Sequence, residues 1–172
     1  VGAAAYVNAM LELLDQASDR GLRVNYVIHA AGSGGTQAGL ILANKALKSK
    51  INILGMSDEP DGDWLVKKTA EIANGTAKLL DLKVQLAPRD VTLIEDYAGE
   101  QYGVLTSEAL EAIKLVAQTE GILLDPVYTS KAMAGLIDMT RRGRFKNEDN
   151  VVFIHTGGTP ALFAYNKELY TS

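Results

Sequence analysis

Hydrophobic positions along the chain follow two periods, which alternate from one segment to the next. Short apolar runs rich in β-branched and aromatic residues predict strands. These runs occupy residues 25–31, 51–57 and 151–158, and a further strand is expected within 83–97. Longer segments with an apolar residue every three or four positions predict helices. These segments are residues 5–14, 36–50, 63–80, 106–121 and 130–143.

Strands that alternate with helices of this length predict an α/β domain with a mainly parallel open sheet. Continuous apolar strands such as VVFIH (151–155) suit a sheet that carries helices on both faces. Gly75 predicts a break in the helix over 63–80. For the helix over 106–121, Ser107 predicts the N-cap and Gly121 the end.

The composition is that of an ordinary globular domain, with 47% hydrophobic residues, 22% charged residues and a net charge of −4. This balance gives no general attraction for nucleic acid or for an anionic membrane. No apolar run is long enough for a transmembrane helix, and no signal peptide is recognisable. The chain has no cysteine, so disulfides, thiolate metal sites and a cysteine nucleophile are excluded, and a cytoplasmic location is expected. The first helical segment has neither a capping residue nor an initiator methionine before it, so we expect a fragment of a longer protein.

Two glycine-rich turns, VIHAAGSGGT and FIHTGGT, each follow a predicted strand. In an open α/β sheet, ligands bind beyond the carboxyl ends of the strands. The first turn holds Gly32, Gly34 and Gly35, with the hydroxyls of Ser33 and Thr36 beside them. Glycines allow a close backbone approach, and the free amides of the next helix start attract phosphate. A tight turn that needs glycine for its geometry alone is the alternative.

The residues around the first turn narrow the choice of phosphate. A nucleoside triphosphate loop requires Lys-Ser or Lys-Thr after its glycines, whereas Gly35 is followed by Thr36 and Gln37. A dinucleotide fingerprint requires glycine at position 37, although Asp58 and Glu59 occur about where a ribose partner would lie. The dinucleotide alternative is thus weakened and stays open, and a small phosphorylated cofactor fits better.

The two histidines, His29 and His155, each follow a predicted strand. For both we expect a buried, hydrogen-bonded side chain rather than a catalyst. Two histidines without an acidic or cysteine cluster predict no metal site.

Four blocks of sequence resemble one family. AGSGGTQAGL, AGEQYGV, EGILLDPVYTSKAMAGLI and FIHTGGTPALFAY together resemble the D-cysteine desulfhydrase and 1-aminocyclopropane-1-carboxylate deaminase family. These are pyridoxal-phosphate enzymes of the tryptophan-synthase-β-like fold. The resemblance covers nearly the whole chain and implies that residues 1–172 are the C-terminal part of the large cofactor-binding domain. It also implies a small amino-acid substrate and a homodimer.

The resemblance implies roles for individual residues. Gly32, Ser33, Gly34, Gly35 and Thr36 would hold the cofactor phosphate, and Thr129, Thr156 and Gly157 would lie at the cofactor ring. Tyr102 and Tyr128 match the two tyrosines on the substrate side of the ring, where a phenol can position substrate or move a proton. Packing alone is the alternative for these tyrosines.

Thr129 and Thr156 discriminate within the family, because the cyclopropane-opening deaminases resemble each other in having Glu and Leu at these positions. A neutral hydroxyl stabilises a protonated pyridine nitrogen far less than a carboxylate does. β-Elimination expels a good leaving group and tolerates this weaker electron sink. The resemblance therefore implies α,β-elimination from D-cysteine or a related small amino acid, giving pyruvate, ammonia and sulfide. The cyclopropane-carboxylate deaminase, a non-catalytic nucleotide-binding module and a degenerate partner subunit are the alternatives.

Some family features differ or are missing. Ser130 stands where relatives often have Gly, and residues 103–106 differ from the usual sequence after the first tyrosine. The N-terminal small domain and the segment with the Schiff-base lysine have no counterpart. Lys45 and Lys131 lie in the wrong context for that lysine, and Lys131 is expected either on a helix surface or as a residue that adjusts the local charge. The fragment alone is therefore expected to be inactive.

Overall fold

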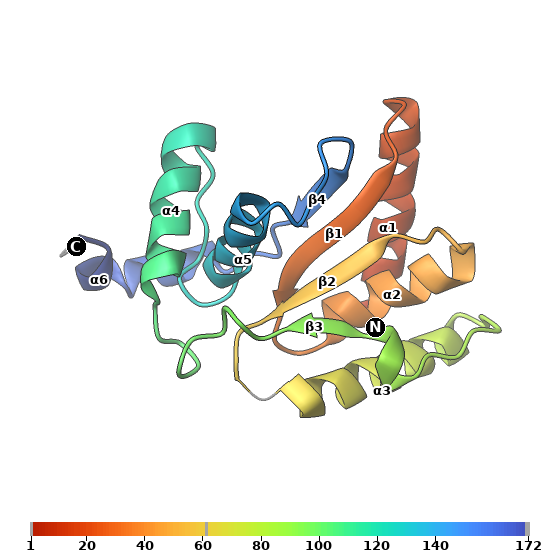
Figure 1. Cartoon of the computed structure of the whole chain (residues 1–172). Coiled ribbons are helices and arrows are strands. Elements are labelled where there is room, and N and C mark those ends of the chain that lie inside the picture. Colours follow the sequence, from red (N-terminus) through yellow and green to blue (C-terminus); the bar gives the residue numbers. More distant parts are fainter. Residues whose placement is uncertain (1, 61, 171–172) are drawn as a thin grey trace.

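The computed structural model describes residues 2–60 and 62–170 and shows one four-stranded parallel sheet, drawn in Figure 1. The strand order is β3-β2-β1-β4. The strands are β1 (Val24–Ala31), β2 (Asn52–Ser57), β3 (Thr92–Ile94) and β4 (Asn150–Ile154). The parallel open sheet predicted from the alternating periods is confirmed.

Helices cover both faces of this sheet, as predicted. One face carries α1 (Gly2–Asp19), α2 (Gly35–Leu47) and α3 (Gly62–Leu79), and the other carries α4 (Ser107–Glu120) and α5 (Thr129–Arg141) (Figure 1). The connections from β1 to β2 to β3 run along the sheet in one direction, and the connection to β4 returns. Because crossovers between parallel strands are right-handed, connections of opposite direction place their helices on opposite faces. Short elements complete the chain: η1 (Pro88–Asp90), η2 (Thr159–Phe163) and α6 (Asn166–Tyr170).

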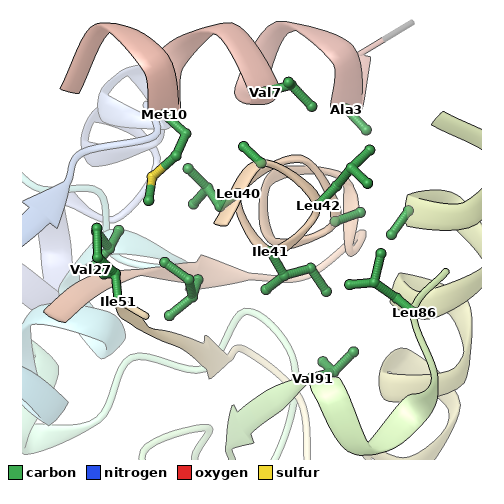
Figure 2. Packing of buried hydrophobic residues seen from close by; sticks show 14 of the residues in the cluster. Ala3, Val7, Met10, Val27, Leu40, Ile41, Leu42, Ile51, Leu86 and Val91 are labelled. Carbon is green, nitrogen blue, oxygen red and sulfur yellow. The ribbon is translucent and has the colours of Figure 1, made fainter. Parts of the chain in front are cut away.

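Helix α2 is buried between α1 and the sheet. Its residues 37–43 are all buried, because Leu40 and Leu42 pack toward α1 and α3 while Ile41 packs toward the strands (Figure 2). Gly39 allows the close approach of α1, since any side chain there would collide with the carbonyl oxygen of Ala3. A fully buried leucine stabilises the fold by about 1.5–3 kcal/mol. The packing of α2 between α1 and the sheet therefore holds the start of α2 in place.

The opposite face has its own core. Ile28, Leu54 and Met56 of the strands pack against Ala132 and Met139 of α5. Neighbouring strand residues Val27 and Ile28 point to opposite faces and belong to different cores, as the strand period of two requires. Helix α4 packs on α5 rather than on the sheet.

Three local predictions need correction. Gly75 does not break α3, because it lies on the exposed side of the helix with nothing within 4 Å of its missing side chain. The N-cap of α4 is Thr106 rather than Ser107, and its side chain accepts a hydrogen bond from the Ala109 amide. Residues 83–87 form no strand; β3 is confined to Thr92–Ile94. Within the described ranges, no helix has the length and hydrophobicity needed to cross a membrane.

Candidate active site

A cavity of about 410 Å³ opens at the carboxyl end of β1, beside the turn that follows β4. The strand order reverses direction between these two strands, and this is where open α/β sheets bind ligands. The lining includes three groups of residues already predicted as a site. They are the first glycine turn, Thr156 of the second turn, and the tyrosines Tyr102 and Tyr128.

The glycine loop, residues 32–36, joins β1 to α2. Gly34 is the N-cap of α2 with φ 78°, and no side chain caps the helix. A side chain at Gly34 would come within 2.6 Å of the Thr69 hydroxyl, and one at Gly32 within 2.7 Å of the Asp58 carboxylate. The positive φ of Gly34 favours glycine there, and a side chain at Gly32 would require the Asp58 carboxylate to move. The uncapped amides of α2 stay available to an anion.

Gly32, Ser33, Gly34 and Thr36 line the cavity, whereas Gly35 does not. The hydroxyls of Ser33 and Thr36 add donors to the amides of the helix start. This donor set suits a phosphate monoester.

Two carboxylates lie on the same cavity wall. Asp58 is only 4% exposed and faces Gly32, and Glu59 follows it. Burial is the main cause that raises the pKa of the Asp58 carboxyl above its usual value. These acids were considered as ribose partners in the dinucleotide alternative, and the structure places them at the glycine loop itself.

Tyr102 and Tyr128 come together at the cavity. Their hydroxyls are hydrogen-bonded to each other, and their ring centroids are 6.0 Å apart at an interplanar angle of 58°. The hydrogen bond between the two hydroxyls, followed by burial, raises the pKa of Tyr128 to about 12. Tyr128 therefore keeps its proton near neutral pH. Two hydroxyls that share one hydrogen bond leave a second proton free for a ligand.

Asp125 organises the turn that carries Tyr128. Its buried carboxylate accepts hydrogen bonds from the amides of Val127, Tyr128 and Thr129, at 2.7–2.8 Å, and from the Thr129 hydroxyl at 2.6 Å. The Thr129 hydroxyl in turn accepts from the Asp125 amide at 2.9 Å. This hydroxyl is fully buried and satisfied, so the structure does not bring Thr129 to the cavity wall, whereas Thr156 does line it. Gly157, with φ 112°, lies next to Thr156 and outside the lining.

Two lining residues had no place in the predicted site. Tyr6 reaches the cavity from α1, and the fully buried Gln37 reaches it from the first turn of α2. The Gln37 amide nitrogen donates to the Thr92 carbonyl at 2.6 Å, which connects the glycine loop to β3. In the sequence, the polar side chain of Gln37 among the mostly apolar residues of α2 was the one indication that this residue has a special position.

The two histidines differ. His29 is fully buried, with Nδ1 2.9 Å from the Ala30 carbonyl oxygen, and burial lowers its pKa to about 4. This confirms the expected core histidine. His155 is exposed, with Nε2 2.9 Å from the Leu123 carbonyl oxygen, so its predicted burial is wrong. Within residues 2–60 and 62–170, no group of three or more acidic or histidine side chains could hold a metal ion.

Lys45 and Lys131, the two lysines whose sequence context does not suit the Schiff base, are not among the residues that line the cavity. Lys45 pairs with Asp90 at 2.8 Å on the outside of α2. Lys131 is 1% exposed, which corrects the helix-surface location expected for it.

The family model for the pyridoxal-phosphate dependent enzymes matches residues 1–157. The chain belongs to this family. It is 41% identical over 169 residues to the D-cysteine desulfhydrase of Klebsiella pneumoniae (strain 342), which covers 98% of this chain and 50% of that protein. The chain thus spans about half the length of the curated relative it matches.

Solved structures agree with this membership. A crystal structure of an ACC deaminase homologue matches with a TM-score of 0.85 and 36% identity, covering 97% of this chain and 49% of the other. A T.th. threonine deaminase matches with a TM-score of 0.55 and 26% identity, covering 91% of this chain and 56% of the other. The expected family and fold are confirmed, and so is pyridoxal phosphate as the family's cofactor.

The cavity residues fit pyridoxal phosphate on this structure's own evidence. The uncapped start of α2 and the close-packed glycines Gly32 and Gly34 suit the phosphate. Thr156 brings a neutral hydroxyl to the same cavity, and the tyrosine pair brings a hydroxyl proton.

Proposed function

We propose that the protein containing this chain catalyses α,β-elimination from D-cysteine or a related small amino acid, giving pyruvate, ammonia and sulfide. The observation that carries this proposal is the single cavity shared by the glycine loop, Thr156 and the tyrosine pair. The similarity to a protein named D-cysteine desulfhydrase over 98% of the chain supports it.

In this proposal, the residues at the start of α2 bind the cofactor phosphate and Thr156 contacts the cofactor ring. Pyridoxal phosphate, when bound, supplies an electron sink for the pair of electrons left when the substrate loses its α proton. The amides at the start of α2, with Ser33 and Thr36, bind the phosphate and fix the position of the ring. Thr156 gives the ring a neutral hydrogen-bonding partner, which suits a substrate with a good leaving group.

The tyrosine pair acts on the substrate side. Tyr128 keeps its proton because its pKa is raised to about 12, and its hydrogen bond with Tyr102 holds the two hydroxyls together. In this proposal, the hydroxyl proton that is not shared within the pair passes to the departing sulfur. In this proposal a phenol oxygen, Tyr102 Oη or Tyr128 Oη, is the proton donor.

The described cavity lacks a lysine that could bind the cofactor covalently. Among the described residues that line the cavity there is no lysine, and the Lys131 amine is engaged by backbone carbonyls. We propose that the lysine that binds the cofactor covalently comes from outside these 172 residues, together with a small domain. A homodimer and a cytoplasmic location, both expected from the sequence, belong to the same proposal.

The test uses the full-length protein loaded with pyridoxal phosphate. With D-cysteine we expect pyruvate and sulfide in equal amounts, and with 1-aminocyclopropane-1-carboxylate no 2-oxobutyrate. Faster formation of 2-oxobutyrate would replace the proposal with the deaminase alternative, which the match to an ACC deaminase homologue favours. Tight binding of a dinucleotide without binding of pyridoxal phosphate would replace it with a non-catalytic nucleotide-binding module.

A further inference from the structure

Lys131 has a buried ammonium group surrounded by backbone carbonyls. The residue lies in the first turn of α5 and is 1% exposed. Its Nζ donates to the carbonyl oxygens of Ala98 at 2.5 Å, Asp58 at 3.3 Å and Gln101 at 3.5 Å. Among the described residues, no carboxylate forms an ion pair with it.

A buried charge of this kind is not explained by stability alone. Removing an ammonium from water is costly, and an apolar side chain of similar volume stabilises a core at least as well. Burial also lowers the pKa of the Lys131 amine, against the opposing effect of the nearby acids Asp58 and Glu59. What the ammonium adds over an apolar side chain is a set of directed bonds to three fixed oxygens.

Those three oxygens belong to the segments that build the cavity. Asp58 directly follows β2, and its side chain lines the cavity. Ala98 and Gln101 lie in the irregular connection between β3 and α4, shortly before Tyr102. Lys131 itself is three residues after Tyr128. One ammonium therefore connects both tyrosine-bearing segments to the end of β2.

The connection that carries Tyr102 has few other attachments. Residues 95–106 contain no helix or strand. The hydroxyl of Tyr165 donates to the Gly103 carbonyl at 2.5 Å on the far side of Tyr102. Between β3 and Tyr102, the backbone bonds of this segment are local, such as the Ala98 amide to the Glu95 carbonyl at 3.0 Å. Just before this stretch, the Tyr97 hydroxyl donates to the Asp138 carboxylate of α5 at 2.5 Å. For residues 98–101 themselves, the long-range hydrogen bonds that the structure describes are those from the Lys131 ammonium to the Ala98 and Gln101 carbonyls.

We propose that Lys131 is a positioning residue whose ammonium holds residues 98–101 against α5 and thereby keeps Tyr102 bonded to Tyr128 over the cavity. The same three carbonyls form a site for a monovalent cation of ammonium size, which Lys131 fills with its own side chain. The catalytic consequence rests on the proposed function, while the positioning itself does not.

The first test measures amide hydrogen exchange in the full-length protein and compares residues 98–103 with 35–47 in α2. Lys131→Met keeps most of the side-chain volume and removes the charge, and Lys68→Met on the exposed side of α3 is the matched control. We expect exchange at 98–103 to accelerate at least about tenfold in Lys131→Met, with α2 unchanged and the control like the wild type. Wild-type exchange at 98–103 in Lys131→Met would overturn the proposal.

The second test asks whether a free cation replaces the side chain. In Lys131→Ala the three carbonyls face an open space, so ammonium chloride should slow exchange at 98–103 toward the wild-type rate. Tetramethylammonium chloride at the same concentration is the control, because that cation is too large and donates no hydrogen bond. Equal effects of the two salts would contradict the proposed cation site.

A third measurement needs no substitution, and so holds even if the variants fail to fold. In the wild-type protein, acetylation of Lys131 requires residues 98–101 to move away, so it should proceed at the rate at which the 98–103 amides open. We expect it to be at least about a hundredfold slower than acetylation of Lys68. Acetylation of Lys131 as fast as that of Lys68, with 98–103 still protected, would refute the positioning role.

The activity measurement separates this proposal from the proposed function. Lys131→Met should lower kcat with D-cysteine more than it raises KM, because the tyrosine pair acts on the reacting substrate. If the wild-type protein has no elimination activity, the proposed function fails, while the exchange and acetylation results still decide the role of Lys131.

Discussion

Gly158 lies against Asp125 with no room for a methyl group between them. A Cβ at Gly158 would be 2.7 Å from Cγ and 2.9 Å from Cβ of Asp125. The same Asp125 carboxylate binds the amides that lead into α5. The turn after β4 and the turn before α5 are thus packed as one unit, although they are distant in sequence.

Gly158→Ala is therefore expected to lower the free energy of unfolding on two grounds. Its φ of 92° is unfavourable for alanine, and the new methyl group would collide with Asp125. The matched control is Gly121→Ala, with φ 67° and nothing within 4 Å. We expect the control to cost about 1–2 kcal/mol and Gly158→Ala roughly a further 1–3 kcal/mol, both by urea unfolding. Equal losses would mean that the contact with Asp125 relaxes freely.

Ser33→Ala should weaken the binding of pyridoxal phosphate to the full-length protein without unfolding it. The Ser33 hydroxyl lines the cavity at the glycine loop, and a hydrogen bond to a charged group contributes about 1.5–3 kcal/mol. The dissociation constant should therefore rise roughly tenfold or more, measured by equilibrium dialysis of the cofactor. Ser18→Ala, on the exposed side of α1, is the control and should leave the affinity unchanged. An unchanged affinity in Ser33→Ala would remove this hydroxyl from the phosphate site.

Tyr102→Phe should lower the pKa of Tyr128. The hydrogen bond with Tyr102 is the largest cause that raises this pKa from 10.0 to about 12, and burial remains after the substitution. A raised folded-state pKa contributes stability that is fully present below pH 10.0 and is lost as the pH rises through about 12. In Tyr102→Phe this loss should begin at a lower pH.

The tyrosinate absorbance, followed during an alkaline titration, measures this effect. Tyr97 has its own pKa raised to about 12, first by burial and then by its hydrogen bond to Asp138. The difference between wild type and Tyr102→Phe removes the contribution of Tyr97 and contains two effects, the lost phenol of Tyr102 and the shift of Tyr128. Asp138→Asn is a useful comparison, because it should shift Tyr97 and leave Tyr128 in place. A Tyr102→Phe titration that loses the signal of one phenol, with the high-pH step at about 12 unchanged, would contradict the bonded pair.

In His29→Gln, the free energy of unfolding should fall less steeply as the pH is lowered below 6.5. Burial lowers the folded-state pKa of His29 from 6.5 to about 4, so the unfolded chain binds a proton that the folded chain excludes. The resulting stability is present above pH 6.5 and is lost as the pH falls toward 4, up to about 3 kcal/mol. Urea unfolding across this range measures the slope, with His155→Gln at the exposed histidine as the control. A steep slope that survives in His29→Gln would assign the acid sensitivity to other groups.

Much of the fold could be predicted because the apolar periods coincide with the observed elements. The strands over 25–31 and 51–57 and the helices over 36–50 and 130–143 all occur within a few residues of their predicted ends. Gly75 misled because a glycine costs a helix only about 1 kcal/mol, and the buried face of α3 outweighs that cost.

Fewer features of the candidate site than of the fold could be predicted from the sequence. The glycine loop and both tyrosines were predicted and share one cavity, but their roles stay predictions. Lys131 was placed on a surface because a charged residue in a helix usually faces water. Its burial depends on three carbonyls from distant segments, which no local pattern reveals. Thr129 was expected at the cofactor ring, and only the structure shows its hydroxyl held by Asp125.

The position of β4 beside β1 has a consequence for how the protein folds. Val24–Ala31 lies near the beginning of the chain and Asn150–Ile154 near its end, yet the two strands pair directly. Contacts between such distant segments form late, because the entropy of closing the long loop must be overcome first. The strands and helices up to β3 can assemble before β4 arrives, whereas the cavity needs both strands. A nascent chain should therefore acquire most of its core before it acquires a place to bind the cofactor.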